Sequence, residues 1–117
     1  MAYVDGFILA VPDDKMEEYK ESARLGEKVW KEYGALDYVE CIADDVPYGE
    51  VTSFPRAVQA KEDETVIFSW AVYKSREHRD GVLKKVMAAP GVEMDAELLP
   101  FDGKRLMYGG FPPLLGL

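Results

Sequence analysis

The sequence predicts an α+β fold in which one antiparallel sheet carries two helices on a single face. The first observation is the run from Thr65 to Tyr73, the densest stretch of β-branched and aromatic residues, which is typical of a strand packed on both faces. The second is a pair of long segments whose apolar residues recur at helical spacing. The third is the order of the segments, which runs strand, helix, strand, strand, helix, strand.

The first strand is expected from Tyr3 to Val11, with Pro12 ending it. Alternate residues of a strand point to opposite faces, and here one set is small and the other bulky. Since small residues let a helix approach a sheet closely, we assign the small set to the helix-covered face and the bulky set to the opposite face. The small set is Val4, Gly6, Ile8 and Ala10, and the bulky set is Tyr3, Asp5, Phe7, Leu9 and Val11.

The first helix is predicted from an N-cap at Asp13 to about Tyr33, with Gly34 as the C-terminal cap. A glycine inside a helix costs about 1 kcal/mol relative to alanine, so Gly26 indicates a close approach to the sheet. The apolar stripe of this helix recurs at spacings of three and four residues and comprises Met16, Tyr19, Ala23, Gly26, Trp30 and Tyr33.

A second strand is expected from Leu36 to Ala43, and the size rule places Cys41 on the helix-covered face. Residues 44–53 mix acidic residues with proline and glycine, which is typical of a loop. Extended structure is expected from Phe54 to Ala60, before a tight acidic turn that leads into the Thr65–Tyr73 strand.

Ser75 is the expected N-cap of the second helix, which ends at Pro90 and Gly91. The segment from Val92 to Leu99 is compatible with one or two helical turns. The last strand is predicted from Lys104 to Gly110. The tail, residues 111–117, cannot form regular structure at its prolines, and because it is apolar we expect it to dock on a surface and not to extend into water.

This order of elements is that of the ferredoxin-like fold, in which the helices cover one sheet face and leave the other bare. The residues that we assign to the bare face are too apolar to remain in water, and a second copy of the same sheet is the simplest cover. We therefore predict a homodimer with two-fold symmetry, a dimeric α/β-barrel. The assigned residues are Tyr3, Phe7, Leu9, Tyr38, Ile42, Phe68, Trp70 and Met107.

Several short motifs also resemble one family. They are Tyr3-Val-Asp-Gly-Phe, Val39-Glu-Cys, Ala43-Asp-Asp-Val-Pro, Phe54-Pro-Arg-Ala-Val, Phe68-Ser-Trp, Pro100-Phe-Asp-Gly-Lys-Arg and Gly109-Gly-Phe. Together they span nearly the whole chain and are similar to the YbaA-like family of uncharacterised bacterial proteins. The resemblance implies a dimeric α/β-barrel of ferredoxin-like protomers and no established activity. The apolar tail departs from the more polar ends of relatives.

Composition excludes several classes of protein. At 117 residues and 48% hydrophobic content the chain is expected to form a single domain, residues 1–117. The net charge of -8 opposes binding to nucleic acid and to anionic membranes, and no apolar run approaches the ~20 residues of a membrane helix. A single cysteine, together with a first segment unlike a secretory signal, predicts a reduced, cytoplasmic protein.

The sequence contains none of the common cofactor, metal or hydrolase motifs. It has no His-Glu-x-x-His, no paired Cys-x-x-Cys, no Gly-x-Ser-x-Gly, no P-loop and no dinucleotide fingerprint. Its one histidine, His78, is interpreted as an ordinary helix residue. We therefore predict no cofactor and no metal site.

Three charged residues are the strongest candidates for chemistry. Strand alternation places Asp5, Glu40 and Arg105 on the helix-free face, near the proposed ligand-binding residues Tyr38, Trp70 and Met107. Two carboxylates and a guanidinium in an aromatic cavity are able to position a small polar substrate and move a proton. The alternative is a structural ion pair, or strand-end residues that reach solvent.

Three functions remain open at this point. The first is a dimer that binds a small organic molecule between the two sheets or between sheet and helices. The second is a cofactor-free enzyme of monooxygenase or isomerase type, by analogy of fold alone. The third is a structural or partner-binding protein that uses the C-terminal tail for recognition.

Overall fold

The computed structural model describes residues 1–92 and 95–117. Four strands form one antiparallel sheet in the order β2-β3-β1-β4, so that β1 and β3 are central and β2 and β4 are the edges. The order of strands and long helices agrees with the predicted α+β arrangement. The elements are β1 (Tyr3–Pro12), α1 (Met16–Glu32), β2 (Asp37–Ile42), α2 (Phe54–Ala57), β3 (Glu64–Tyr73), α3 (Arg76–Met87) and β4 (Met107–Phe111).

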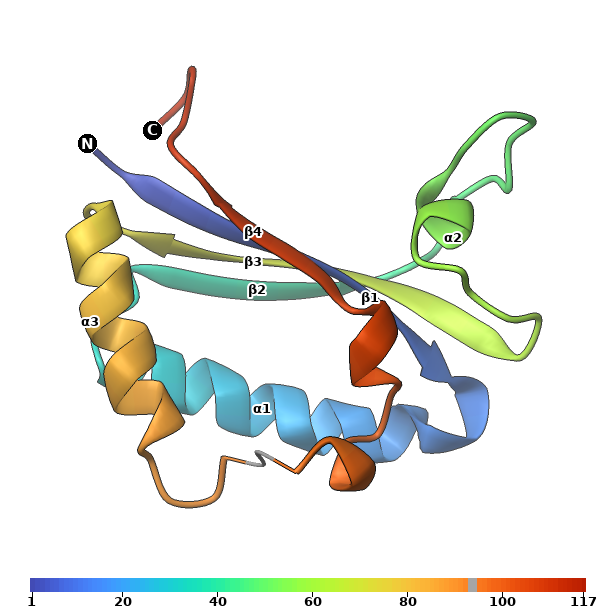
Figure 1. Ribbon diagram of the computed structural model, residues 1–117, viewed down its shortest axis with the longest axis horizontal. Helices are drawn as coiled ribbons and strands as arrows, with labels where there is room; N and C mark the ends of the chain where they lie inside the picture. The colour runs from blue at the N-terminus through green and yellow to red at the C-terminus, as the bar shows by residue number, and fades with distance from the viewer. Residues whose placement is uncertain (93–94) are drawn as a thin grey trace.

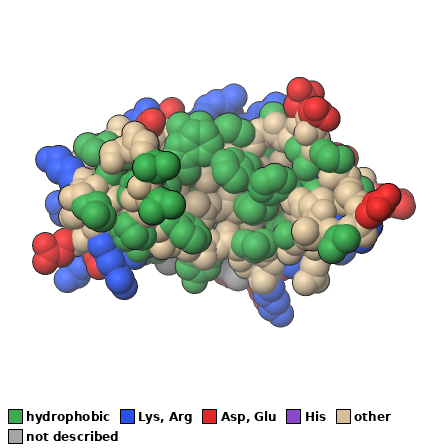
Figure 2. All heavy atoms as spheres, turned by 90° about the horizontal axis from the view of Figure 1, so that it is seen from above, with side chains coloured by type: hydrophobic (Ala, Val, Ile, Leu, Met, Phe, Trp, Pro, Cys, Tyr) green, Lys and Arg blue, Asp and Glu red, His purple; other side chains and the backbone are tan. Residues whose placement is uncertain are grey.

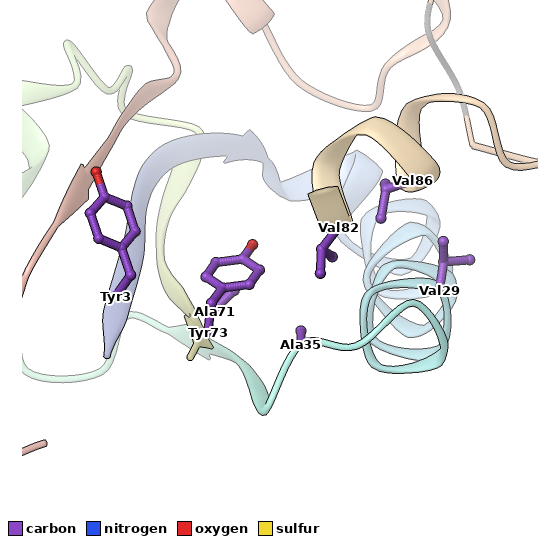
Figure 3. Close-up of a cluster of buried hydrophobic side chains, with 7 residues drawn as sticks. All are labelled: Tyr3, Val29, Ala35, Ala71, Tyr73, Val82 and Val86. Atoms are coloured by element: carbon purple, nitrogen blue, oxygen red, sulfur yellow. The ribbon is translucent and has the colours of Figure 1, made fainter. Parts of the chain in front are cut away.

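The two long helices, α1 and α3, lie on one side of the sheet, as predicted (Figure 1). Between these layers Val29 of α1 and Val82 and Val86 of α3 pack against Tyr73 and Ala71 of β3 (Figure 3). A second cluster beneath α1 contains Leu9, Val11, Tyr19 and Ile67. The short helix α2 and the C-terminal segment rise on the other side of the sheet, where they flank its opposite face (Figure 1).

The assignment of the two faces of β1 is wrong. Tyr3, Leu9 and Val11 are 8%, 3% and 0% exposed beneath the helices, whereas a side chain added at Gly6 would meet nothing within 4 Å. The size rule failed because large side chains, not close backbone approach, fill the space between helices and sheet. By the same register Phe7, Tyr38 and Ile42 belong to the helix side, and Cys41 is exposed on the opposite face.

The face without long helices is nevertheless strongly apolar, and we call it the open face. Phe68, Trp70 and Met107 lie on it as predicted. Figure 2 shows hydrophobic side chains gathered across this surface. At one end α2 and the residue after it cover the sheet, because Val58 packs there against Ala10 and Val66. The uncovered part of the open face comprises Val4, Ile8, Phe68, Trp70, Val72, Met107 and Phe111.

Two helix caps follow the sequence prediction. Ser75 accepts a hydrogen bond from the backbone N–H of His78 at 3.0 Å and begins α3. Gly34 has a φ of 120°, the left-handed conformation that ends α1. Asp13 is not the cap of α1, because it begins a 3₁₀ turn and accepts a hydrogen bond from the Thr65 hydroxyl at 2.6 Å.

Three other segments differ from expectation. The stretch predicted to be extended from Phe54 begins with α2, because Ser53 caps the backbone N–H of Arg56 and proline suits the first turn of a helix. The last strand starts later than Lys104, since residues 103–105 form a 3₁₀ turn. Of the segment Val92–Leu99, residues 96–98 form a 3₁₀ turn, and residues 93 and 94 lie outside the described part of the chain.

The C-terminal tail is not docked within the chain. Leu114 and Leu115 are 94% and 88% exposed, although Leu117 reaches the rim of the open face.

Across residues 1–92 and 95–117, none of the helices combines the length and the apolar character needed to cross a membrane.

Candidate functional site

A cavity of about 230 Å³ lies between α1 and the sheet, and we call it the α1 cavity. The helix provides one wall, β1, β2 and β3 provide the floor, and five residues between α3 and β4, at positions 91, 92, 99, 101 and 106, provide the remaining side. Aromatic and aliphatic side chains make up most of its lining. The described lining residues are Phe7, Tyr19, Ser22, Ala23, Leu25, Gly26, Trp30, Tyr38, Glu40, Ser69, Gly91, Val92, Leu99, Phe101 and Leu106.

Glu40 is the polar centre of this cavity. The Tyr38 hydroxyl donates a hydrogen bond to its Oε2 at 2.7 Å, and the Tyr19 hydroxyl donates another to its Oε1. Burial, reinforced by the Glu40 carboxylate, raises the pKa of both tyrosines well above the ordinary value. Both hydroxyls therefore stay protonated and keep donating to Glu40 across the physiological pH range.

Helical and strand periodicity bring these side chains together. Tyr19, Gly26 and Trp30 lie on one stripe of α1, while Tyr38 and Glu40 are two residues apart on β2 and share a face. The rings of Trp30 and Tyr38 are tilted against each other with centroids 5.4 Å apart. The Trp30 indole N–H donates to the Tyr73 hydroxyl at 3.1 Å, and this bond helps to orient the indole ring.

Gly26 is required where α1 meets Tyr38. A Cβ at this position would lie 2.6 Å from the Tyr38 hydroxyl oxygen, which is closer than real contacts allow. The predicted close approach at Gly26 is therefore confirmed, and the contacting group is a tyrosine of β2.

Replacing Gly26 with alanine is expected to lower the free energy of unfolding by about 1 kcal/mol, because displacement of Tyr38 outweighs the gain in helix propensity. Gly81→Ala in α3 is the matched control, since a Cβ there meets nothing within 4 Å. The control is expected to stabilise by roughly 0.5–1 kcal/mol. Urea denaturation of both variants measures the difference, and equal effects would contradict the steric argument.

The predicted grouping of Asp5, Glu40 and Arg105 is wrong, because the structure separates them. Asp5 lies beneath α3, where its Oδ1 pairs with Nη1 of Arg79 at 2.6 Å. Burial raises the pKa of the Asp5 carboxyl, and the Arg79 guanidinium opposes this effect. Asp5 is outside the α1 cavity lining.

Arg105 lies in the turn before β4, not on the sheet face. Its guanidinium binds both carboxylate oxygens of Glu64 at 2.7 Å and Oδ2 of Asp102 at 3.0 Å. It also donates to the Gln59 carbonyl at 2.7 Å. Arg105 thus forms the structural ion pair that was the alternative interpretation of the charged residues.

The proposed ligand-binding residues divide between two surfaces. Tyr38 lines the α1 cavity, whereas Trp70 and Met107 line a hollow of about 670 Å³ on the open face. Sequence reasoning missed Tyr19, Trp30 and Phe101 as site residues. The signal was present for Tyr19 and Trp30, because tyrosine and tryptophan in a helix stripe carry polar atoms that need partners once buried. Phe101 gave no such signal.

The contacts of His78, the single histidine of the sequence, fit a structural role. His78 accepts a hydrogen bond from the backbone N–H of Lys74 at 3.0 Å and its ring packs against Tyr73. Within residues 1–92 and 95–117, no group of three or more His, Cys, Asp or Glu side chains is arranged to hold a metal ion.

Comparison with known proteins places the chain in a family. A protein-family model described as "Protein of unknown function (DUF1428)" matches residues 2–103 of the chain. The chain belongs to the DUF1428 family. Its relatives in this family include "Uncharacterized protein YbaA" of Escherichia coli strain K12 and of Shigella flexneri, each 50% identical over 115 residues that cover 98% of both chains. The resemblance to YbaA-like proteins is confirmed.

Solved structures support the fold of this DUF1428 member. Rv0793 from Mycobacterium tuberculosis has a TM-score of 0.61 at 11% identity, with 99% of this chain and 98% of that chain covered. A dimeric ferredoxin-like protein from an uncultured marine organism has a TM-score of 0.58 at 12% identity, with 100% of both chains covered. At such identities the likeness shows the fold alone, and it confirms the predicted ferredoxin-like α+β architecture.

Proposed function

We propose that this protein is a homodimer that binds a small organic molecule in the α1 cavity of each protomer. The observation that carries the binding proposal is Glu40, a carboxylate held by two tyrosine hydroxyls in a mainly apolar, aromatic cavity. Ligand sites are usually mainly apolar and contain a few fixed polar groups that orient the ligand. Asp5 and Arg105 lie outside this lining, so we assign them stabilising roles.

The open face supports the homodimer. Its apolar residues form one continuous patch and are not scattered singly over the surface. Continuous apolar patches of this kind mark interaction sites. A second copy fits because the same patch on both partners is self-complementary around a two-fold axis. The similar solved structure described as a dimeric ferredoxin-like protein is consistent with this assembly. The exposed tail lies beside the patch, and we assign it to the same interface.

The two tryptophans provide a direct test of ligand binding, because Trp30 lines the α1 cavity and Trp70 lies on the open face. A fragment mixture of neutral, cationic and anionic aromatic molecules is expected to shift the Trp30 indole N–H signal in ¹H–¹⁵N NMR spectra and to leave the Trp70 signal unchanged. Ala23→Leu fills the cavity and is expected to abolish the shift, whereas Lys28→Leu on the outer side of α1 preserves it.

Fragments that move only the Trp70 signal, or that bind Ala23→Leu and the unmodified protein equally, would contradict binding in the α1 cavity. Either result would instead favour the open face as the ligand site.

A second candidate is a cofactor-free isomerase that uses the same cavity. Glu40 has lone pairs left after accepting two hydrogen bonds, so it is able to take a proton from a carbon beside a carbonyl and return it to a neighbouring atom. This candidate predicts that the unmodified protein turns over a substrate. It also predicts that the Glu40→Gln variant loses this turnover but still binds the ligand. Binding without turnover in the unmodified protein favours the first proposal.

A further inference from the structure

We propose that the ligand of the α1 cavity is a small organic cation, an amine or quaternary ammonium group attached to a compact apolar body. This inference rests on the proposed function, since it specifies which class of molecule the cavity selects. Three features lead to it: the charge of the lining, the arrangement of the aromatic rings and the unused hydrogen-bonding capacity of Glu40.

The charge of the lining is entirely negative among the described residues. Glu40 is the one ionisable acid in that lining, and no lysine, arginine or histidine accompanies it. The carboxylate of Glu40 therefore has no cationic partner on the cavity side. A charge in a mainly apolar site is stabilised best by an opposite charge, and none of the described lining residues of the α1 cavity supplies one.

Basic side chains do occur on the outer side of Glu40. Lys20 and Arg24 line a neighbouring hollow that Glu40 also borders. Both are already paired along α1, Lys20 with Glu17 and Arg24 with Glu21. The two sides of Glu40 thus differ, and the cavity side is the one that presents an uncompensated carboxylate.

Aromatic rings surround the same space. Trp30 and Tyr38 have centroids 5.4 Å apart, and Tyr19 and Phe101 form an edge-to-face pair at 5.8 Å. The face of an aromatic ring carries negative charge density and attracts a cation within about 6 Å, most strongly for tryptophan and where water is excluded. Rings and carboxylate therefore favour the same sign of ligand charge.

The hydrogen-bonding pattern of Glu40 opposes an anionic ligand. Its two oxygens offer about four acceptor positions, of which Tyr19 and Tyr38 occupy two. The remaining positions accept an N–H donor. Both tyrosine hydroxyls direct their protons at Glu40, so they are not free to donate to an anionic ligand, which the carboxylate would also repel.

The size of the cavity limits the ligand further. Its volume of about 230 Å³ is below the range of roughly 300–1,000 Å³ that accommodates drug-sized molecules. A single ring with one amine-bearing carbon fits this limit, and a nucleotide or a polycyclic compound does not.

Three probes of nearly equal shape test the inference: benzylamine, benzyl alcohol and benzoate, each titrated into the full-length protein while the Trp30 indole signal is followed by NMR. Benzylamine is expected to bind at least tenfold more tightly than the other two, as a charge-assisted hydrogen bond predicts. Glu40→Gln is expected to remove this preference by lowering benzylamine affinity about tenfold while changing benzyl alcohol affinity by less than about twofold.

The outcomes separate the two proposals. Equal or tighter binding of benzyl alcohol or benzoate, with the Trp30 signal shifted, would overturn the cation inference and leave ligand binding in the α1 cavity intact. A Trp30 signal that no probe shifts would overturn both. Because the three-probe comparison uses the unmodified protein, the result does not depend on whether Glu40→Gln folds.

Discussion

Substituting lysine for Phe68 is expected to convert the proposed homodimer into monomers. Phe68 is 42% exposed near the middle of the open face, where its ring packs edge-on against Trp70 and Phe54 at centroid distances of 5.7 and 5.8 Å. An ammonium group at this position would be buried in a dimer without a partner, at a cost of several kcal/mol. Sedimentation velocity at micromolar concentration measures the change in mass.

Met87→Lys is the matched control for this substitution. Met87 is also a half-exposed apolar residue, but it lies at the end of α3 on the opposite side of the sheet. The control is expected to remain dimeric. A stable dimer of Phe68→Lys, or an unmodified protein that sediments as a monomer, would show that the open face is not the interface.

Replacing Arg105 with methionine is expected to destabilise the fold by about 3–5 kcal/mol, the cost of removing one partner from a buried ion pair. The Glu64 side chain is 3% exposed and would lose both of its hydrogen bonds to the guanidinium. The connection between α2 and β3 would also lose the contact between Arg105 and the Gln59 carbonyl. Urea denaturation at neutral pH measures the loss.

The pH dependence of stability provides a second measurement on the same pair. The Arg105 guanidinium holds the pKa of Glu64 below its ordinary value of 4.5. A lowered pKa in the folded state contributes stability that is present above the unfolded value and is lost as pH falls through the folded value. The difference in stability between the unmodified protein and Arg105→Met is therefore expected to narrow below about pH 4.5.

The double variant Glu64→Gln with Arg105→Met controls for lost packing. It removes the unpaired charge, so it is expected to be more stable than Arg105→Met alone. If the double variant is as unstable as Arg105→Met, the lost stability comes from the packing of the arginine side chain and not from the Glu64 carboxylate left without its cationic partner.

The kinds and order of the strands and long helices were predictable because local spacing determines them. Alternation in β1 and the three-and-four spacing in α1 are properties of the chain itself. Which face of β1 receives the helices is a tertiary property. Both faces of the sheet are apolar, so alternation identified the residues that share a face without identifying the layer that covers it.

The predicted grouping of Asp5, Glu40 and Arg105 was partly wrong for the same reason. Asp5 and Glu40 do share a face, as alternation requires, but it is the helix side, and α3 and α1 supply each of them with its own partners. The predicted position of Arg105 on the sheet was wrong for a different reason, because the last strand begins beyond it at Met107. The partners of Glu40 were foreseeable only in part, since burial of Tyr19 creates a need for an acceptor without naming one.

The edge position of β4 has a consequence for how this chain avoids uncontrolled polymerisation. Exposed sheet edges are templates for fibril growth, and short strands or prolines protect them. β4 ends at Phe111 and is followed at once by Pro112 and Pro113, which have no backbone N–H to offer an incoming strand. The edge that β4 offers to an incoming strand therefore cannot be extended past Phe111, which keeps it to five residues.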